Sequence, residues 1–308
     1  MNIFSSYNLT FLSFIFFSIF CNQTFADIKV AVTIKPLHSL VVGLTDGAAH
    51  PDLLIRGNNS PHQPSLRPSD IAKIDNADLI IANHPGFSGL LSTAINNARH
   101  KTKVLTLSEM PDIHSLPARN IKEQHTKLDH HSHSHGSVDP HFWLNIANMQ
   151  IFVTQVTRTL TELDPKNSTI YLANRDNLLD QLKILDHKIK KKMDTVNHGG
   201  VKILLFHDAY QYFEKRYNIH AEAFITASPE HRPGTRHLSD LQQKIAEGSI
   251  TCALSEPQFS SRIFDNILTK EQVQRGTIDP IGSQLEPGKK AYFQLMEMVA
   301  ESFYSCHL

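Results

Sequence analysis

The sequence predicts an α/β fold in which two parallel-sheet lobes are joined by one long, rigid helix. In each half of the chain, short runs rich in apolar and β-branched residues alternate with helical patterns, which is typical of βαβ units. Between the halves, apolar residues recur at helical spacing over about seven turns. The chain has 308 residues, of which 41% are hydrophobic, and this is enough for two domains with sizeable cores.

Residues 1–26 are predicted to be a cleaved signal peptide. Leu9–Phe20 is a run of 12 residues without charge, too short for a bilayer span of about 20 residues. Thr24 and Ala26 place small residues at the positions that a signal peptidase reads, so cleavage is expected after Ala26. Since no Lys or Arg precedes the run, two alternatives stay open: lipoprotein processing at Cys21 and an ordinary N-terminal core helix.

Residues 27–163 are predicted to form the first lobe. Its expected strands are Ile28–Ile34, Asp52–Ile55, Asp78–Ala82 and Lys103–Leu107. Its expected helices are Ser69–Asn76, Phe87–Arg99 and Ala147–Leu160. Residues 108–137 lack apolar periodicity and are expected to form a loop. This loop is rich in histidine: His114, His125, His130, His131, His133 and His135.

Residues 164–198 are predicted to form the linker helix. Its apolar face consists of Tyr171, Leu178, Leu182, Leu185, Ile189, Met193 and Val196. Asp164 followed by Pro165 is a helix start signal, and the Gly199–Gly200 pair is a stop signal. A helix of this length resists bending, so a large hinge closure between the lobes is disfavoured. A coiled-coil dimer is the alternative interpretation of the same periodicity.

Residues 199–308 are predicted to form the second lobe. Its expected strands are Lys202–Phe206, His220–Ile225, Thr251–Ser255 and Gly276–Ile278. Its expected helices are Tyr210–Tyr217, His237–Glu247 and Ser261–Leu268. If Cys21 leaves with the signal peptide, Cys252 and Cys306 remain as an even pair in an exported chain, which favours one disulfide over two free thiols.

Charge and composition exclude some classes of function and favour others. Basic and acidic residues number 30 each, so the chain lacks the basic excess of a nucleic-acid-binding protein. The count of 19 histidines points to metal chemistry, because neutral imidazole is a common zinc ligand. A zinc hydrolase would also need a positioned base; there is no HExxH motif, and Gly86 to Gly89 does not fit GxSxG. Glu256 is the best candidate for such a base.

Three histidines are well placed for a metal site. In an open parallel sheet, ligands gather beyond the carboxyl ends of the strands. His62 follows the strand predicted at Asp52–Ile55, and His207 closes the strand predicted at Lys202–Phe206. His141 lies at the entry to a predicted helix. Taken singly, each of the three is more often a hydrogen-bonded structural histidine than a ligand.

Five motifs carry a family resemblance across the whole chain after the signal peptide. HQPSLRPSD, DPHFW, FHDAYQYFEKRY, SEPQF and GTIDPIG, in this order, resemble the zinc-binding subunits of bacterial ABC importers, the ZnuA-type cluster A-I solute-binding proteins. The resemblance implies a periplasmic, non-enzymatic and monomeric receptor that holds zinc in the cleft between its lobes and passes it to a membrane permease. It also implies that His62, His141 and His207 are the ligands.

The resemblance leaves the fourth ligand open. Many zinc members have an acidic residue immediately before the first histidine, but Pro61 stands there in this chain and cannot ligate. Asp279 in GTIDPIG, a water molecule or a loop histidine could take that position. Asp139 and Asp208 adjoin the ligands and could either orient their imidazoles or cap nearby turns.

The loop histidines and the metal's identity also allow alternatives. His125, His130, His131, His133 and His135 are interpreted as an accessory group that gathers or senses zinc, with a solvated spacer as the alternative. Three imidazoles suit zinc better than manganese, which prefers oxygen, yet a receptor for manganese, copper or another divalent metal stays open. Because protons compete for imidazole, zinc affinity is expected to drop as the pH falls through about 6.5.

Overall fold

The computed structural model describes residues 27–57, 59–62, 65–85, 89–98, 100–119, 138–196, 200–227, 233–260, 262–268 and 273–307. Each half of this chain contains one four-stranded parallel sheet. The first sheet has the order β2 (Asp52–Leu53), β1 (Val30–Val32), β3 (Leu79–Ala82) and β4 (Lys103–Thr106). The second has the order β6 (Ala221–Thr226), β5 (Ile203–His207), β7 (Cys252–Ser255) and β8 (Gln274–Thr277). The predicted fold class is therefore confirmed.

The central strands of both sheets are buried on both faces. Every residue of β1, β3 and β5 is buried, which explains why these strands are continuous apolar runs rather than alternating ones. Both sheets also reverse their strand order at the same place, between β1 and β3 in the first and between β5 and β7 in the second. In a parallel sheet this reversal opens a crevice at the carboxyl ends of the two strands.

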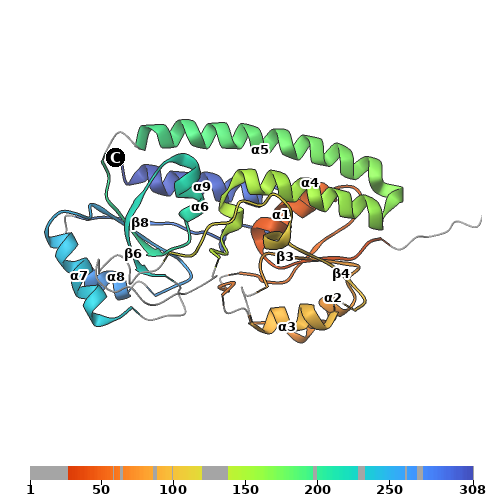
Figure 1. Cartoon of the computed structure of the whole chain (residues 1–308), viewed down its shortest axis with the longest axis horizontal. Coiled ribbons are helices and arrows are strands. Elements are labelled where there is room, and N and C mark those ends of the chain that lie inside the picture. The colour runs from red at the N-terminus through yellow and green to blue at the C-terminus, as the bar shows by residue number, and fades with distance from the viewer. Residues whose placement is uncertain are drawn as a thin grey trace, which may run out of the picture.

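Helices cover the sheets in layers (Figure 1). One layer runs along both halves and contains α1 (Lys35–Leu44), α4 (Ile146–Leu163), α5 (Ser168–Val196) and α9 (Ala291–Ser305). On the far side, α2 (Pro68–Asp75) and α3 (Gly89–Ala98) cover the first sheet. On that same side, α7 (Thr235–Ala246) and α8 (Arg262–Ile267) cover the second. The short helix α6 (Gln211–Tyr217) follows β5.

The long helix α5 has 29 residues, a length of about 44 Å at 1.5 Å per residue. Its buried residues are the seven that the periodicity predicted: Tyr171, Leu178, Leu182, Leu185, Ile189, Met193 and Val196. They face α4, α9 and α1 of the same chain. The apolar face is thus occupied within the monomer, which removes the basis for a coiled-coil dimer.

The start of α5 differs from the prediction. Pro165–Asn167 forms a separate 3₁₀ turn, and the α-helix begins only at Ser168. Asp164 makes no capping bond to a backbone N–H. Its carboxylate instead accepts hydrogen bonds from the Asn167 amide at 2.7 Å and the Tyr171 hydroxyl at 2.6 Å. Other observed boundaries also differ from the predicted ones: β1 is shorter than the predicted strand Ile28–Ile34, and β8 begins before Gly276.

One apolar cluster joins the two halves. It runs from β1 and β3 through α1, α4, α5 and α9 to β5 and α6. A second, smaller cluster lies between the second sheet and α7 and α8. The predicted disulfide Cys252–Cys306 is present and joins the start of β7 to the end of α9.

Two predicted segments lie largely outside the described residues: the signal peptide and residues 120–137 of the histidine-rich loop. Within the described part of that loop, Leu107–Glu109 forms a 3₁₀ turn, and Pro117 pairs with Val138 in an isolated antiparallel bridge. Among the described residues, no helix combines the length and the apolar character that a membrane crossing demands.

Candidate metal centre

Three histidines from distant parts of the chain converge at one point between the two sheets. His62 lies in the segment that follows β2, His141 stands directly before a 3₁₀ turn at Phe142–Leu144, and His207 is the last residue of β5. His141 and His207 are buried, whereas His62 is half-buried. The chain therefore brings together the three histidines singled out from the sequence.

Their spacing suits one small cation. One ring nitrogen of each histidine lies within 4.8 Å of the corresponding nitrogens of the other two. The Nε2 atoms of His141 and His207 are 3.4 Å apart. Within the described parts of the chain, this is the single group of three or more potential metal ligands. Three nitrogens at these distances can hold a tetrahedral ion such as zinc and leave its fourth position open.

Buried carboxylates orient two of the rings. Nδ1 of His141 lies 2.7 Å from Oδ1 of Asp139, and Nδ1 of His207 lies 2.6 Å from Oε1 of Glu256. A carboxylate accepts, so each Nδ1 carries the proton and each Nε2 is left with a lone pair for a metal. Asp139 also accepts the backbone N–H of His141 at 3.0 Å. Asp139 thus orients an imidazole, which was one of the two roles considered for it.

Burial controls how these groups bind protons. Desolvation, and then the proximity of His141 and His207, lowers the pKa of His62 to about 2. Burial likewise holds the pKa of His141 well below its ordinary value. Burial also disfavours the charged form of His207, but the Glu256 carboxylate outweighs this and raises the pKa of His207. Burial raises the pKa of Asp139 to about 7, against the His141 N–H and the charge of Arg119.

Asp279 stays outside the cluster of histidines. Its Oδ1 accepts from Nε2 of Gln258 at 2.6 Å and from the backbone N–H groups of Ile281 and Gly282, each at 3.0 Å. Its Oδ2 accepts from the backbone N–H and the hydroxyl of Ser283 at 2.6 and 2.8 Å. Five donors therefore fix this carboxylate, and it organises the turn after β8.

Asp208 orients no imidazole, although it directly follows His207. Its carboxylate accepts from Nε of Arg119 at 3.0 and 2.8 Å, and Arg119 also reaches Glu214. Arg119 is not among the residues predicted from the sequence, and Glu256 is predicted there only as a candidate base. A carboxylate that directly follows a strand beside His207 was the signal for Glu256.

The surroundings of the histidines are mostly apolar. Pro61, Trp143, Phe259, Pro280 and Ile281 line a cavity of about 10 Å³ together with the three histidines, which is room for one water-sized particle. The Trp143 ring lies 5.3 Å from the His141 ring, centroid to centroid. A site this small fits a single ion. The accessory histidines His125, His130, His131, His133 and His135 lie outside the described residues.

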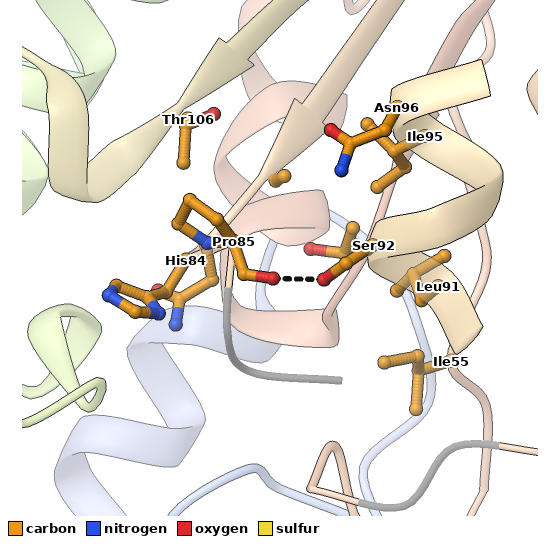
Figure 2. A pocket seen from close by; sticks show the side chains of 11 residues that line it. Ile55, His84, Pro85, Leu91, Ser92, Ile95, Asn96 and Thr106 are labelled. Carbon is orange, nitrogen blue, oxygen red and sulfur yellow. Dashed lines mark hydrogen bonds between the residues drawn. The ribbon is translucent and has the colours of Figure 1, made fainter. Parts of the chain in front are cut away.

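The first sheet has its own crevice at the reversal of strand order, shown in Figure 2. Thr33, Asn83, His84 and Thr106 line it from the strand ends, and α3 closes the other side. The His84 imidazole points away from the side chains of α3 (Figure 2). No group of three metal-ligating side chains gathers here among the described residues. The group of three histidines instead includes His207, which ends β5 at the reversal of strand order in the second sheet, where Glu256 follows β7.

Comparison with known proteins agrees with this geometry. Residues 30–306 match the family model described as zinc-uptake complex component A, periplasmic. The chain is 30% identical over 330 aligned residues to the high-affinity zinc uptake system protein ZnuA of Brucella abortus (strain 2308), covering 96% of this chain and 97% of that protein.

Two solved structures share the fold at low identity. The periplasmic zinc-binding protein TroA from Treponema pallidum has a TM-score of 0.78 at 18% identity, covering 91% of this chain and 99% of that one. FpvC from Pseudomonas aeruginosa, in complex with Mn²⁺, has a TM-score of 0.76 at 18% identity, covering 92% of this chain and 99% of that one.

Proposed function

Because the chain belongs to the family of periplasmic zinc-uptake component A proteins, we propose that it is a periplasmic zinc receptor. It binds one zinc ion through Nε2 of His141, Nε2 of His207 and a ring nitrogen of His62, and delivers the ion to the membrane permease of an ABC importer. Zinc is the cargo, and the protein performs no reaction on it. The contact of Glu256 supports this view, since its carboxylate lies 2.6 Å from Nδ1 of His207 and so serves to orient a ligand.

The observation that carries the proposal is the convergence of three imidazole nitrogens within 4.8 Å in a small, largely apolar cavity. An all-nitrogen donor set favours zinc over manganese, which prefers oxygen ligands. Both carboxylate oxygens of Asp279 already accept from five donors, which supports a donor set without Asp279. Manganese is the second candidate, because FpvC holds Mn²⁺ on the same fold.

Several expectations about the whole chain form part of the same proposal. Residues 1–26 direct export and are removed, and the remaining chain acts as a monomer. Residues 27–163 and 199–308 form the lobes, with residues 164–198 as the linker. The loop histidines gather zinc with lower affinity than the cleft, because a loop loses chain entropy when it chelates an ion.

Metal analysis and competitive zinc titration of residues 27–308 test the proposal. His62→Ala, His141→Ala and His207→Ala each remove one of three ligands. Each is expected to weaken the cleft site by more than the 10–100-fold that loss of an orienting partner costs. Trp143 fluorescence follows the binding, because the indole lies against His141 and is the single tryptophan of the chain.

His220→Ala is the matched control, since the side chain of His220 is 80% exposed and lies outside the cluster. This variant should bind zinc as the parent chain does. Weak zinc binding at the loop should persist in all three ligand variants. Stoichiometric, tight binding by His141→Ala or His207→Ala would refute the cleft site, and preference for Mn²⁺ in direct competition would favour the second candidate.

A further inference from the structure

All three guanidinium nitrogens of Arg119 donate hydrogen bonds to two buried carboxylates. Nε donates to both oxygens of Asp208 at 3.0 and 2.8 Å, and Nη2 also contacts Asp208. Nη1 and Nη2 donate to the two oxygens of Glu214 at 3.0 and 2.8 Å. The side chains of Asp208 and Glu214 are each 4% exposed, so this ion triad is largely removed from water.

The segment that carries Arg119 is joined to the segment that carries His141. Pro117 pairs with Val138, and the backbone N–H of Asp139 donates to the Leu116 carbonyl at 2.9 Å. These two segments form one unit, in which Asp139 holds Nδ1 of His141. A displacement of Arg119 therefore acts on the segment that orients His141.

Polar side chains of helix α6 form hydrogen bonds with this unit. The Tyr212 hydroxyl accepts the backbone N–H of Leu116 and donates to the Asp139 carbonyl, each at 3.0 Å. Nε2 of Gln211 donates to the Pro117 carbonyl at 3.0 Å. The sequence places His141 in the region before the linker helix, but the hydrogen bonds of Leu116, Pro117 and Asp139 attach its segment to α6.

Arg119 is the ionic link in this attachment. Its first partner, Asp208, directly follows His207, and its second partner, Glu214, lies on α6. The arginine thus connects the segment of His141 to the residue next to His207, whose Nε2 lies 3.4 Å from that of His141. Two carboxylates outnumber its one positive charge, so the triad does not repel a cation in the neighbouring cavity.

We propose that Arg119 is a positioning residue of the metal site: by holding Asp208 and Glu214 it fixes the separation of His141 and His207. This proposal rests on the proposed zinc-binding function. The planar guanidinium of an arginine that pairs with two carboxylates fixes both their separation and their orientation. A lysine ammonium, which acts as a point charge, cannot do this. The spacing of the two buried ligands is then already correct before the ion arrives.

The test compares two arginines that both attach to α6. Arg216 makes a similar bidentate pair with Asp186, at 2.6 and 2.5 Å, but that pair joins α6 to α5. Its longer contact, from Nη1 to Oδ1 of Asn145 at 3.4 Å, reaches neither a ligand nor a residue that orients one. Arg119→Met and Arg216→Met are compared with the parent chain in two measurements, competitive zinc titration and thermal unfolding of the zinc-free protein. Arg119→Lys keeps the charge but loses the fork.

Arg119→Met is expected to lower zinc affinity by about 10–100-fold, and Arg119→Lys by a smaller factor. Arg216→Met should lower the unfolding temperature while leaving zinc affinity within about twofold of the parent, as expected for a substitution outside the site. Since Arg119→Met leaves two buried carboxylates without a cation, the triple substitution Arg119→Met, Asp208→Asn, Glu214→Gln provides a charge-balanced variant with the same expected loss of affinity.

Parent-like zinc affinity in both Arg119→Met and the charge-balanced variant would overturn the positioning role. An equal loss of affinity in Arg216→Met would overturn it too, because the effect would then follow general destabilisation. Failure of the parent chain itself to bind zinc would instead refute the proposed function, so the two failures are distinguishable.

Discussion

At the scale of single residues, two carboxylates orient the imidazoles for a metal, but the pKa values of the two rings are shifted in opposite directions. Asp139 and Glu256 each hold an Nδ1 proton and direct Nε2 toward the cavity. Burial lowers the pKa of His141, whereas Glu256 outweighs burial and raises the pKa of His207. In the zinc-free chain, protons therefore compete for His207 at a higher pH than they compete for His141.

The pH dependence of zinc affinity follows from this difference. Burial lowers the pKa of His62 to about 2 and holds the pKa of His141 well below its ordinary value, so protons compete only weakly for these two rings near neutral pH. The pKa of His207 is raised, so protons compete with zinc for it already above pH 6.5. We expect affinity to fall as the pH decreases, by about tenfold per pH unit for the proton on His207 and more steeply below pH 7, where Asp139 also takes up a proton.

Competitive titration at several values between pH 5 and 8 measures this slope. The simple expectation from three ordinary histidines was a steeper loss centred near pH 6.5. A slope of more than two protons would show that His62 and His141 also bind protons in this range, against the lowering of their pKa values. His220→Ala serves as the control, because its exposed ring should leave the slope unchanged.

The three histidines could be identified from the sequence because each one lies just beyond a strand or before a helix, inside a recognisable motif. Their partners were harder to identify. Arg119 meets Asp208 across 89 residues and Glu214 across 95, and no local pattern encodes such a pairing. Asp279 is predicted as a possible ligand, and the sequence gives no sign that the backbone of its own turn would donate to both carboxylate oxygens.

At the scale of secondary-structure elements, α5 shows which features local sequence determines. A helix exposed on one side and buried on the other gives a strong periodic signal, so its seven buried positions could be predicted. Its first turn could not, because Asp164 bonds Asn167 and Tyr171 instead of capping the backbone. Strand ends were likewise misplaced, since a strand ends where its neighbour stops pairing rather than where its apolar run ends.

Leu182 and Ile184 test the role of this helix face. Leu182 is fully buried on α5, whereas Ile184 is 70% exposed on the opposite face. Leu182→Ala is expected to destabilise the zinc-free chain by about 2–5 kcal/mol through lost apolar contact and a residual cavity. Ile184→Ala, the matched control, should stay within about 0.5 kcal/mol of the parent. Equal effects in chemical denaturation would contradict the packing of α5 described above.

At the scale of the whole molecule, the two halves are held together by more than the linker. Nζ of Lys35, at the start of α1, donates to the carbonyl groups of Gly282, Ser283 and Leu285 in the other half, at 2.6, 2.8 and 2.7 Å. Nε1 of Trp143 donates to the Pro280 carbonyl at 2.6 Å. A wide opening of the cleft would break these buried bonds as well as divide the shared apolar cluster.

We therefore expect zinc to bind without a large change of overall shape. Small-angle scattering of residues 27–308 should give radii of gyration that agree within about 1 Å with and without zinc, as in other preorganised complexes. His207→Ala, measured with the same zinc additions, controls for effects of the metal outside the cleft. A contraction of several ångströms in the parent but not in His207→Ala would mean that the halves close on the ion, and that the bonds of Lys35 and Trp143 form only in the zinc-bound state.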